Sequence, residues 1–486
     1  MFSRILVVAI VIFLIVTFLS EYLPDWLTFS LIAVLSGGYA FYEYKRRIRT
    51  FIDLKIGSIV GFRTKFQMYS IGYAQYRYVD IYNAVSKYIS EQQEVITIET
   101  TNEGFLPYFM DMDWFGDDSK KITKGSSIHF KISYDEEVFV PRQRIWVIKK
   151  GEKDFCILHI KFHANTYLDV ACLDEKFVDE LMDIIYEDSV KNSIYKNKLL
   201  SLTYDNEIQE DEGSTIQYRD VNITFLPPKT MTEESIVLEE EIAHIIKRNI
   251  FDFFAQKDKL AAQHVPLHRG LLFYGSPGTG KTYTCHYIYH TLKNATCIVA
   301  SGNSLMHIKS VCNLARMLQP ALVILEDVDL VFASREVNAY GGTLGELMDQ
   351  LDGFKADDNI IFILTTNTLD RIESAIKDRP GRINQIIHFD VPTKNLRLKY
   401  FQNYLLPYDT TNLDVSELAQ KVEGVSQAFI KDLVFRAVQI ALEESNYQDV
   451  EKVCLQMNHF DIALREIIKY NNQAAYAILK YKDDIL

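Results

Sequence analysis

A glycine-rich segment holds the residues of this sequence that are best suited to chemistry. It joins an apolar stretch at residues 270–274 (GLLFY) to a stretch of helical character at residues 283–292, with the spacing G-x-x-x-x-G-K-T. Glycines in this spacing let backbone N–H groups surround phosphates, and the helix that follows directs the positive end of its dipole at them. The segment predicts a nucleotide-phosphate site made of Gly275, Ser276, Pro277, Gly278, Thr279, Gly280, Lys281 and Thr282.

Two side chains of this loop have distinct expected roles. Lys281 reaches the β and γ phosphate oxygens, and Thr282 places its hydroxyl on Mg²⁺. ATP and Mg²⁺ are therefore the expected cofactors. The alternative is an ordinary glycine-rich turn, and the coincidence of strand, loop and helix argues against it.

A group of acids ends the next apolar stretch, residues 321–325 (ALVIL). Such a stretch is typical of a strand buried in a parallel sheet, and carboxylates at its carboxyl end face the nucleotide crevice. We assign Glu326 to the metal and Asp327 to the attacking water, because phosphoryl transfer depends on positioning and charge. The Asp327 side chain is short, so we expect slow hydrolysis. The alternative to a catalytic role is a strand that ends in ordinary surface acids.

A third apolar stretch, residues 360–364 (IIFIL), leads into Thr365, Thr366 and Asn367. The Asn367 amide can sense the γ-phosphate and orient water. Further on, Arg379 and Arg382 flank a Pro-Gly turn, from which a guanidinium can reach across a subunit boundary. An arginine supplied by a neighbour raises the rate by about 10³–10⁵-fold, which predicts that hydrolysis requires assembly.

The composition limits the class of protein. With 486 residues, of which 48% are hydrophobic and 24% charged, we expect two or three folded domains. A net charge of -13 argues against a nucleic-acid partner. The six cysteines form no C-x-x-C pair, which favours thiols in a reducing compartment over disulfides or zinc.

The first 50 residues predict a transmembrane hairpin anchor. Residues 2–19 carry one charge and residues 27–42 carry none, and each run is close to the length that spans a bilayer. Basic residues at both ends place the motor domain on the cytoplasmic or matrix side of an integral membrane protein. A cleaved signal peptide is one alternative, but there is no A-x-A-like site. A single crossing is another, and it would reverse the side.

Residues 51–230 predict an α+β middle domain. Strand-like runs lie at residues 94–99, 127–133, 144–149 and 155–162, and helical spacing lies at residues 78–90 and 176–195. We interpret His129, His159 and His163 as ordinary core or surface histidines rather than a metal site. The acidic run at residues 204–213 (YDNEIQEDEG) is interpreted as a solvated loop.

The motifs at residues 275–282, 326–329, 366–367 and 379–382 resemble, in order and spacing, the AAA family of ring ATPases. The resemblance covers residues 236–470. The phrases LLFYGSPGTGKT, LEDVD followed by FASRE, and LDGF are most similar to the family of the membrane-anchored mitochondrial chaperone that translocates the folded Rieske protein, or to a prokaryotic relative. That family shares the Glu-Asp order, whereas the superfamily usually has Asp before Glu.

The resemblance implies an α/β fold: a P-loop αβα AAA+ module at residues 231–392 and a small helical lid with a C-terminal helix at residues 393–486. Residues 424–438 resemble one lid helix and the turn before it. A homo-oligomeric ring of six or seven subunits is also implied. Residues 304–309 lack the aromatic-glycine pair of protein-threading rings. Tyr340, Gly341 and Gly342 could line a pore as a second loop, and a simple surface turn is the alternative.

Three functions are compared. The first is a membrane-anchored ATPase that remodels or translocates a protein client. The second is a nucleotide-gated membrane assembly scaffold with little turnover, for which the inverted acidic pair argues. The third, a membrane-bound protease, lacks H-E-x-x-H, because the close pair His286 and His290 has no glutamate between them.

Overall fold

The computed structural model describes residues 67–99, 127–150, 154–162, 165–211, 214–227, 236–329, 343–369, 383–447 and 452–470. The chain divides into two compact units. One comprises Met1–Phe130 and Val138–Lys191, and the other comprises Lys131–Glu137 and Asn192–Leu486.

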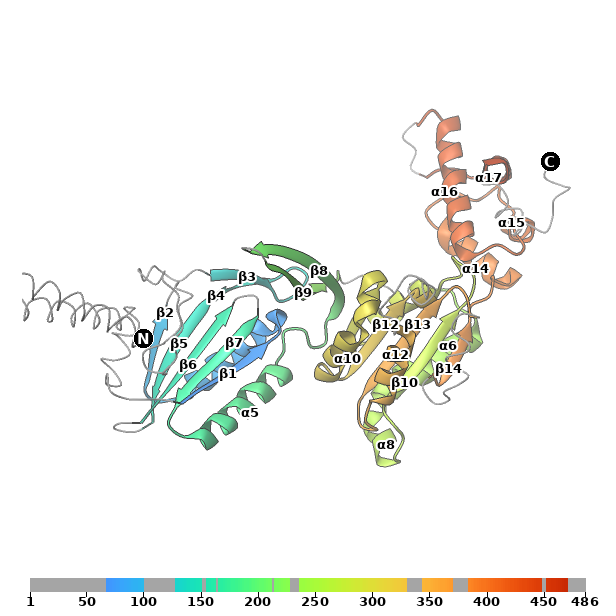
Figure 1. The fold of residues 1–486 in the computed structure, drawn as a ribbon. Coiled ribbons are helices and arrows are strands. Elements are labelled where there is room, and N and C mark those ends of the chain that lie inside the picture. The colour runs from blue at the N-terminus through green and yellow to red at the C-terminus, as the bar shows by residue number, and fades with distance from the viewer. Residues whose placement is uncertain are drawn as a thin grey trace, which may run out of the picture. The chain divides into compact units, whose positions relative to one another are not determined.

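The first unit is an antiparallel five-stranded sheet with two long helices that pack on each other (Figure 1). The strand order is β1-β7-β6-β5-β2, and every neighbouring pair is antiparallel. A separate two-stranded sheet is formed by β3 (Ser127–Lys131) and β4 (Glu137–Pro141). The five strands are β1 (Gln67–Tyr73), β2 (Val95–Glu99), β5 (Gln143–Lys149), β6 (Phe155–Phe162) and β7 (Thr166–Cys172), and the helices are α4 (Tyr78–Ser90) and α5 (Glu175–Lys191).

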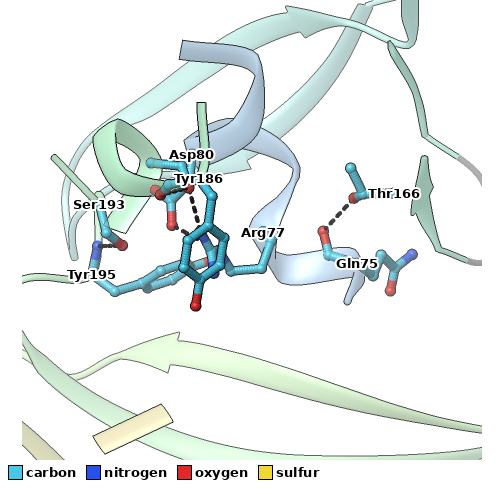
Figure 2. A network of polar contacts seen from close by, with 8 residues as sticks. Gln75, Arg77, Asp80, Thr166, Tyr186, Ser193 and Tyr195 are labelled. Atoms are coloured by element: carbon cyan, nitrogen blue, oxygen red, sulfur yellow. Dashed lines mark hydrogen bonds and ion pairs between the residues drawn. The ribbon is translucent and has the colours of Figure 1, made fainter. Parts of the chain in front are cut away.

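A buried arginine joins the two helices (Figure 2). Arg77, which precedes α4, is 5% exposed, and its Nη2 donates to Ser189 Oγ of α5 at 2.6 Å. Its Nε lies 3.5 Å from a carboxylate oxygen of Asp80, and its guanidinium lies over the ring of Tyr186. A buried charge requires such partners, so Arg77 fixes the start of α4 against the end of α5.

The second unit is built on a seven-stranded sheet, ordered β14-β10-β13-β12-β11-β8-β9. All neighbouring pairs are parallel except β8 and β9, and the strands from β10 to β13 are almost fully buried. The strands are β8 (Leu199–Asp211), β9 (Ser214–Phe225), β10 (Arg269–Tyr274), β11 (Thr296–Ser301), β12 (Ala321–Glu326), β13 (Ile360–Thr366) and β14 (Gln385–His388). The apolar stretches expected at residues 270–274, 321–325 and 360–364 are three of these strands.

α-Helices, a π-helical stretch (η3) and a 3₁₀ helix (η4) connect these strands. Those described here are α6 (Glu240–Ile246), η3 (Lys247–Phe251), α7 (Asp252–Ala255), α8 (Lys257–Ala262), α9 (Lys281–Thr291), η4 (Gly302–His307), α10 (Ile308–Met317) and α12 (Thr343–Asp352). Strands and helices that alternate along the chain are typical of an α/β sheet. The α/β prediction for this part of the chain is confirmed.

The hairpin of β8 and β9 corrects one prediction. Residues 204–211 continue β8 through the acidic run that was interpreted as a loop, and they pair with β9 in regular antiparallel register. Leu199–Ser201 pair in parallel with Cys297–Val299, so the hairpin extends the large sheet, although the sequence placed it in the middle domain. Strand preference depends on cross-strand partners, and a single charged segment does not reveal them.

A group of helices with its own apolar core completes the second unit. The helix α16 begins at Gln427, after Gly424 at φ 83°, and the Ser426 hydroxyl accepts a hydrogen bond from the backbone N–H of Phe429. The helix and turn expected at residues 424–438 are therefore present. The group consists of α14 (Lys394–Leu405), α15 (Val415–Lys421), α16 (Gln427–Glu444) and α17 (Met457–Tyr470).

The localisation expected from the sequence requires correction. Within the described ranges, no helix combines the length and the apolar character that a membrane crossing needs. This finding overturns the assignment as an integral membrane protein, and the transmembrane part of the predicted fold is not supported. The two apolar runs on which that prediction relied, residues 2–19 and 27–42, lie outside the described residues.

Candidate active site

The glycine-rich segment forms a loop between β10 and α9. Gly275, Gly278 and Gly280 have φ angles of 152°, 79° and 101°, a region that side chains rarely adopt. A Cβ on Gly275 would lie 2.1 Å from the carbonyl oxygen of Phe389, so this position accepts only glycine. The local conformation therefore explains the glycines, and it leaves α9 to begin at Lys281.

Lys281 is the buried cation of this loop, with 6% of its surface exposed. Its Nζ donates to the carbonyl oxygens of Gly275 and Ser276 at 2.7 and 3.0 Å, and to Asn367 Oδ1 at 3.0 Å. Burial lowers the pKa of Lys281, while the nearby Asp327 raises it. The lysine thus connects the loop with the end of β13.

Glu326 ends β12 next to the loop. Burial and the neighbouring Asp327 raise the pKa of the Glu326 carboxyl, and a hydrogen bond with the Thr282 side chain opposes this effect. A hydroxyl and a carboxylate, which are hard oxygen ligands of the kind that Mg²⁺ takes, therefore lie together. A cation here would relieve the repulsion between the two carboxylates, so the donor set fits Mg²⁺.

Asp327 has an unusual backbone for a residue other than glycine, with φ 49°. Its N–H donates to Thr365 Oγ1 at 3.0 Å, and its Oδ1 accepts from Asn367 Nδ2 at 3.5 Å. Left-handed residues of this kind cost about 1–3 kcal/mol and concentrate at functional sites. The parallel strands β12 and β13 thus bring Glu326, Asp327 and Asn367 to one edge of the sheet.

Asp329 is a site residue to which the sequence analysis gave no role. It is 5% exposed, and its Oδ1 accepts from Thr366 Oγ1 at 3.0 Å and from the Asn367 N–H at 3.2 Å. It holds the backbone from which the Asn367 amide extends. One feature of the sequence could have indicated this residue: Asp329 is a third acid after the apolar stretch at residues 321–325, and the neighbouring apolar stretch also ends in polar residues.

The first turn of α16 contacts the phosphate loop, a contact that the sequence analysis did not predict. The Ala428 N–H donates to the Gly278 carbonyl oxygen at 3.1 Å. A Cβ on Gly280 would lie 2.6 Å from Gln427 Oε1, so Gln427 lies against the loop. The helical group and the loop are therefore in direct contact.

Several predicted residues are placed elsewhere or not described. Arg379, Arg382 and the segment from Tyr340 to Gly342 lie outside the described residues. His286 and His290 belong to α9, as expected. His159 is buried beside Asp169, with 3.4 Å between His159 Nδ1 and a carboxylate oxygen, and His129 packs on the Phe139 ring, whereas His163 is not described. In the described ranges there is no group of three or more potential metal ligands.

Comparison with known families identifies the domain that this loop belongs to. Residues 271–391 match the family described as "ATPase family associated with various cellular activities (AAA)". The chain carries an AAA ATPase domain. Binding of ATP follows from this assignment, and the matched residues include the loop, both acidic positions and Asn367.

The chain is also similar to individual known proteins, at below 30% identity. An ATP-dependent zinc metalloprotease FtsH 2 from Thermoanaerobacter sp. (strain X514) is 27% identical over 292 residues, covering 57% of this chain and 53% of that protein. A 26S proteasome regulatory subunit 8 homolog from Schizosaccharomyces pombe is 28% identical over 233 residues, covering 44% of this chain and 56% of that subunit. The Saccharomyces cerevisiae homolog is 27% identical, with 44% and 54% covered.

The chain spans little more than half the length of these relatives. These comparisons do not confirm the more specific likeness to the chaperone of the Rieske protein.

Proposed function

We propose that the chain hydrolyses Mg·ATP between the subunits of a homo-oligomeric ring and uses the energy to remodel or translocate a protein client. The observation that carries the proposal is the position of Asn367, whose side-chain amide contacts Lys281 on one side and Asp327 on the other. One amide thus connects the group that meets the γ-phosphate with the group that meets the attacking water.

Each residue of the site has a role in this proposal. Lys281 gives up its loop carbonyl partners to bind the β and γ phosphates, and the loop N–H groups bind the remaining oxygens. Thr282 and Glu326 would hold Mg²⁺, which supplies charge neutralisation to the phosphates when bound. Asp327 accepts a proton from the attacking water, and Asn367 keeps that carboxylate and the γ-phosphate in line.

In this proposal, hydrolysis depends on ring assembly because of the two arginines of the Pro-Gly turn. We expect Arg379, or Arg382, to reach the ATP of the adjacent subunit, as the AAA resemblance implies. A site without its neighbour would then lack its transition-state cation. The ring of six or seven subunits remains a prediction on this basis.

A protein client is the substrate class that the relatives favour. Their names are those of an ATP-dependent metalloprotease and of regulatory subunits of the 26S proteasome. The residues 304–309 contain no aromatic-glycine pair; Leu305 among them is buried, whereas Met306 is 44% exposed. This favours a client moved in its folded state, in line with the likeness to the chaperone of the Rieske protein.

A nucleotide-gated assembly scaffold with little turnover is the second candidate. The short Asp327 side chain favours it, because it limits how far the carboxylate reaches toward the γ-phosphate. Tight ATP binding with negligible turnover would support the scaffold over the remodelling ATPase.

Replacement of the loop lysine tests the ATP site. Lys281→Ala is expected to weaken ATP binding by at least tenfold and to abolish hydrolysis, because no other cation contacts the loop carbonyls among the described contacts. Lys293→Ala, at an exposed position two residues after α9, is the matched control and should bind ATP normally. Titration with a fluorescent ATP analogue measures binding, and phosphate release measures turnover. Equal affinity in both variants would refute the assigned site.

A further inference from the structure

Two cysteines lie opposite each other in the first unit, on neighbouring strands of its sheet. The register pairs Ile157 of β6 with Ala171 of β7 in antiparallel sense, so the next pair along is Cys156 and Cys172. Directly opposite residues have Cα atoms about 4.5–5.5 Å apart, within the range that a disulfide spans. Both thiols are buried with 0% exposure, and a hydrogen bond joins them.

The surroundings make the two sulfur atoms unequal. The hydrogen bond from Cys156 lowers the pKa of Cys172 to about 6, with further help from the backbone of Asp174 and from Lys150, whereas burial opposes the shift. The pKa of Cys156 is raised by the same hydrogen bond and by burial. The contact thus favours the thiolate form of Cys172 and the protonated form of Cys156, which is the arrangement of a reactive dithiol.

The remaining described cysteines differ from this pair. Burial raises the pKa of Cys285, Cys297 and Cys312, which keeps these thiols protonated and unreactive. Cys454 is exposed.

The cysteine pair lies close to the end of a strand, because Cys172 is the last residue of β7 and Leu173 after it is 53% exposed. Local opening at this strand end would expose the pair to a small oxidant.

We propose that Cys156 and Cys172 form a reversible dithiol–disulfide site that reacts with small hydroperoxides. The Cys172 thiolate attacks one oxygen of hydrogen peroxide and breaks the O–O bond, giving a sulfenic acid and hydroxide. The Cys156 sulfur then attacks the Cys172 sulfur, its proton and the hydroxyl of the sulfenic acid leave as water, and a disulfide remains. Two thiols are oxidised and one peroxide is reduced to two waters.

The test uses the full chain carrying Cys454→Ser, treated with hydrogen peroxide and then unfolded in the presence of a maleimide. Peptide mass spectrometry should find Cys156 and Cys172 joined, with the other three cysteines labelled, and dithiothreitol should restore two thiols. The rate should rise as pH increases through about 6, following the Cys172 thiolate. The proposal is overturned if both cysteines keep their labels, or if the bond forms only in chain unfolded beforehand.

Single variants separate the two sulfurs. In Cys156→Ser, a dimedone-type probe should trap a sulfenic acid at Cys172, because the serine hydroxyl still donates a hydrogen bond but cannot form the disulfide. In Cys172→Ser, Cys156 should remain unmodified. Cys312→Ser is the matched control and should form the disulfide at the normal rate. Trapping at Cys156 rather than Cys172 would contradict the assigned order.

Discussion

At the residue scale, the site is defined by a few buried contacts. The sequence identified Lys281, Glu326, Asp327 and Asn367 as candidates, and the parallel strands bring their side chains together. The role of Asp329 could not be predicted in the same way, because its contacts with Thr366 and Asn367 arise from packing between two strands. Spacing along one segment carries no information about such a partner.

The length of residue 327 should control the rate of hydrolysis. Asp327→Glu is expected to raise kcat, by roughly tenfold if the short side chain limits general-base catalysis, which contributes about 10²–10⁴-fold in enzymes. Affinity for ATP should stay within about twofold, since the phosphate loop is untouched. Steady-state phosphate release gives kcat. A lower kcat in the glutamate variant would contradict this prediction. It would show that the contacts of residue 327 with Asn367 and Thr365 require the length of an aspartate.

Asp329 is expected to act by positioning Asn367. Asp329→Asn loses charge-assisted hydrogen bonds to the Thr366 hydroxyl and the Asn367 N–H, so kcat should fall by about tenfold or more while ATP affinity changes little. Asp357→Asn, at an exposed position, serves as the control. A merely structural role would instead lower the melting temperature and leave kcat of the folded fraction unchanged.

At the element scale, the sequence predicted the strand-loop-helix unit at residues 270–292 closely, because the loop glycines and the apolar strand leave a local pattern. The helix at residues 176–195 was predicted four residues too long, since α5 ends at Lys191. Tyr195, beyond that end, stacks on Phe225 of β9. The hairpin of β8 and β9 was missed because its pairing with β11 lies about 100 residues away along the chain.

The phosphate loop should tolerate no side chain at Gly275, next to Phe389. Gly275→Ala places a Cβ 2.1 Å from the Phe389 carbonyl oxygen, so we expect a loss of several degrees in melting temperature. Gly302→Ala is the matched control, because Gly302 also has a positive φ, of 54°, but has nothing within 4 Å of the added atom. Calorimetry of both variants measures the difference. Similar melting temperatures would mean that the clash is relieved by a shift of the chain.

At the scale of the whole molecule, the comparisons support one ATPase domain within a longer chain. The ring, the client and the arginines of the Pro-Gly turn depend on the AAA resemblance and on motifs, not on contacts within one subunit. The amino-acid composition does not indicate the ring size or the client. The expected membrane crossing illustrates the limit, since hydropathy of two short runs was its only basis.

Hydrolysis between neighbouring subunits is the central claim, and mixing two inactive variants tests it most directly. Asp327→Asn lacks the group for water, and Arg379→Ala lacks the arginine given to the neighbour. In an equimolar mixed ring, about a quarter of the sites combine an intact Asp327 with an intact Arg379 from the next subunit. We predict that phosphate release, absent in each variant alone, returns to about a quarter of the natural rate. No recovery in rings shown to contain both variants would contradict the account.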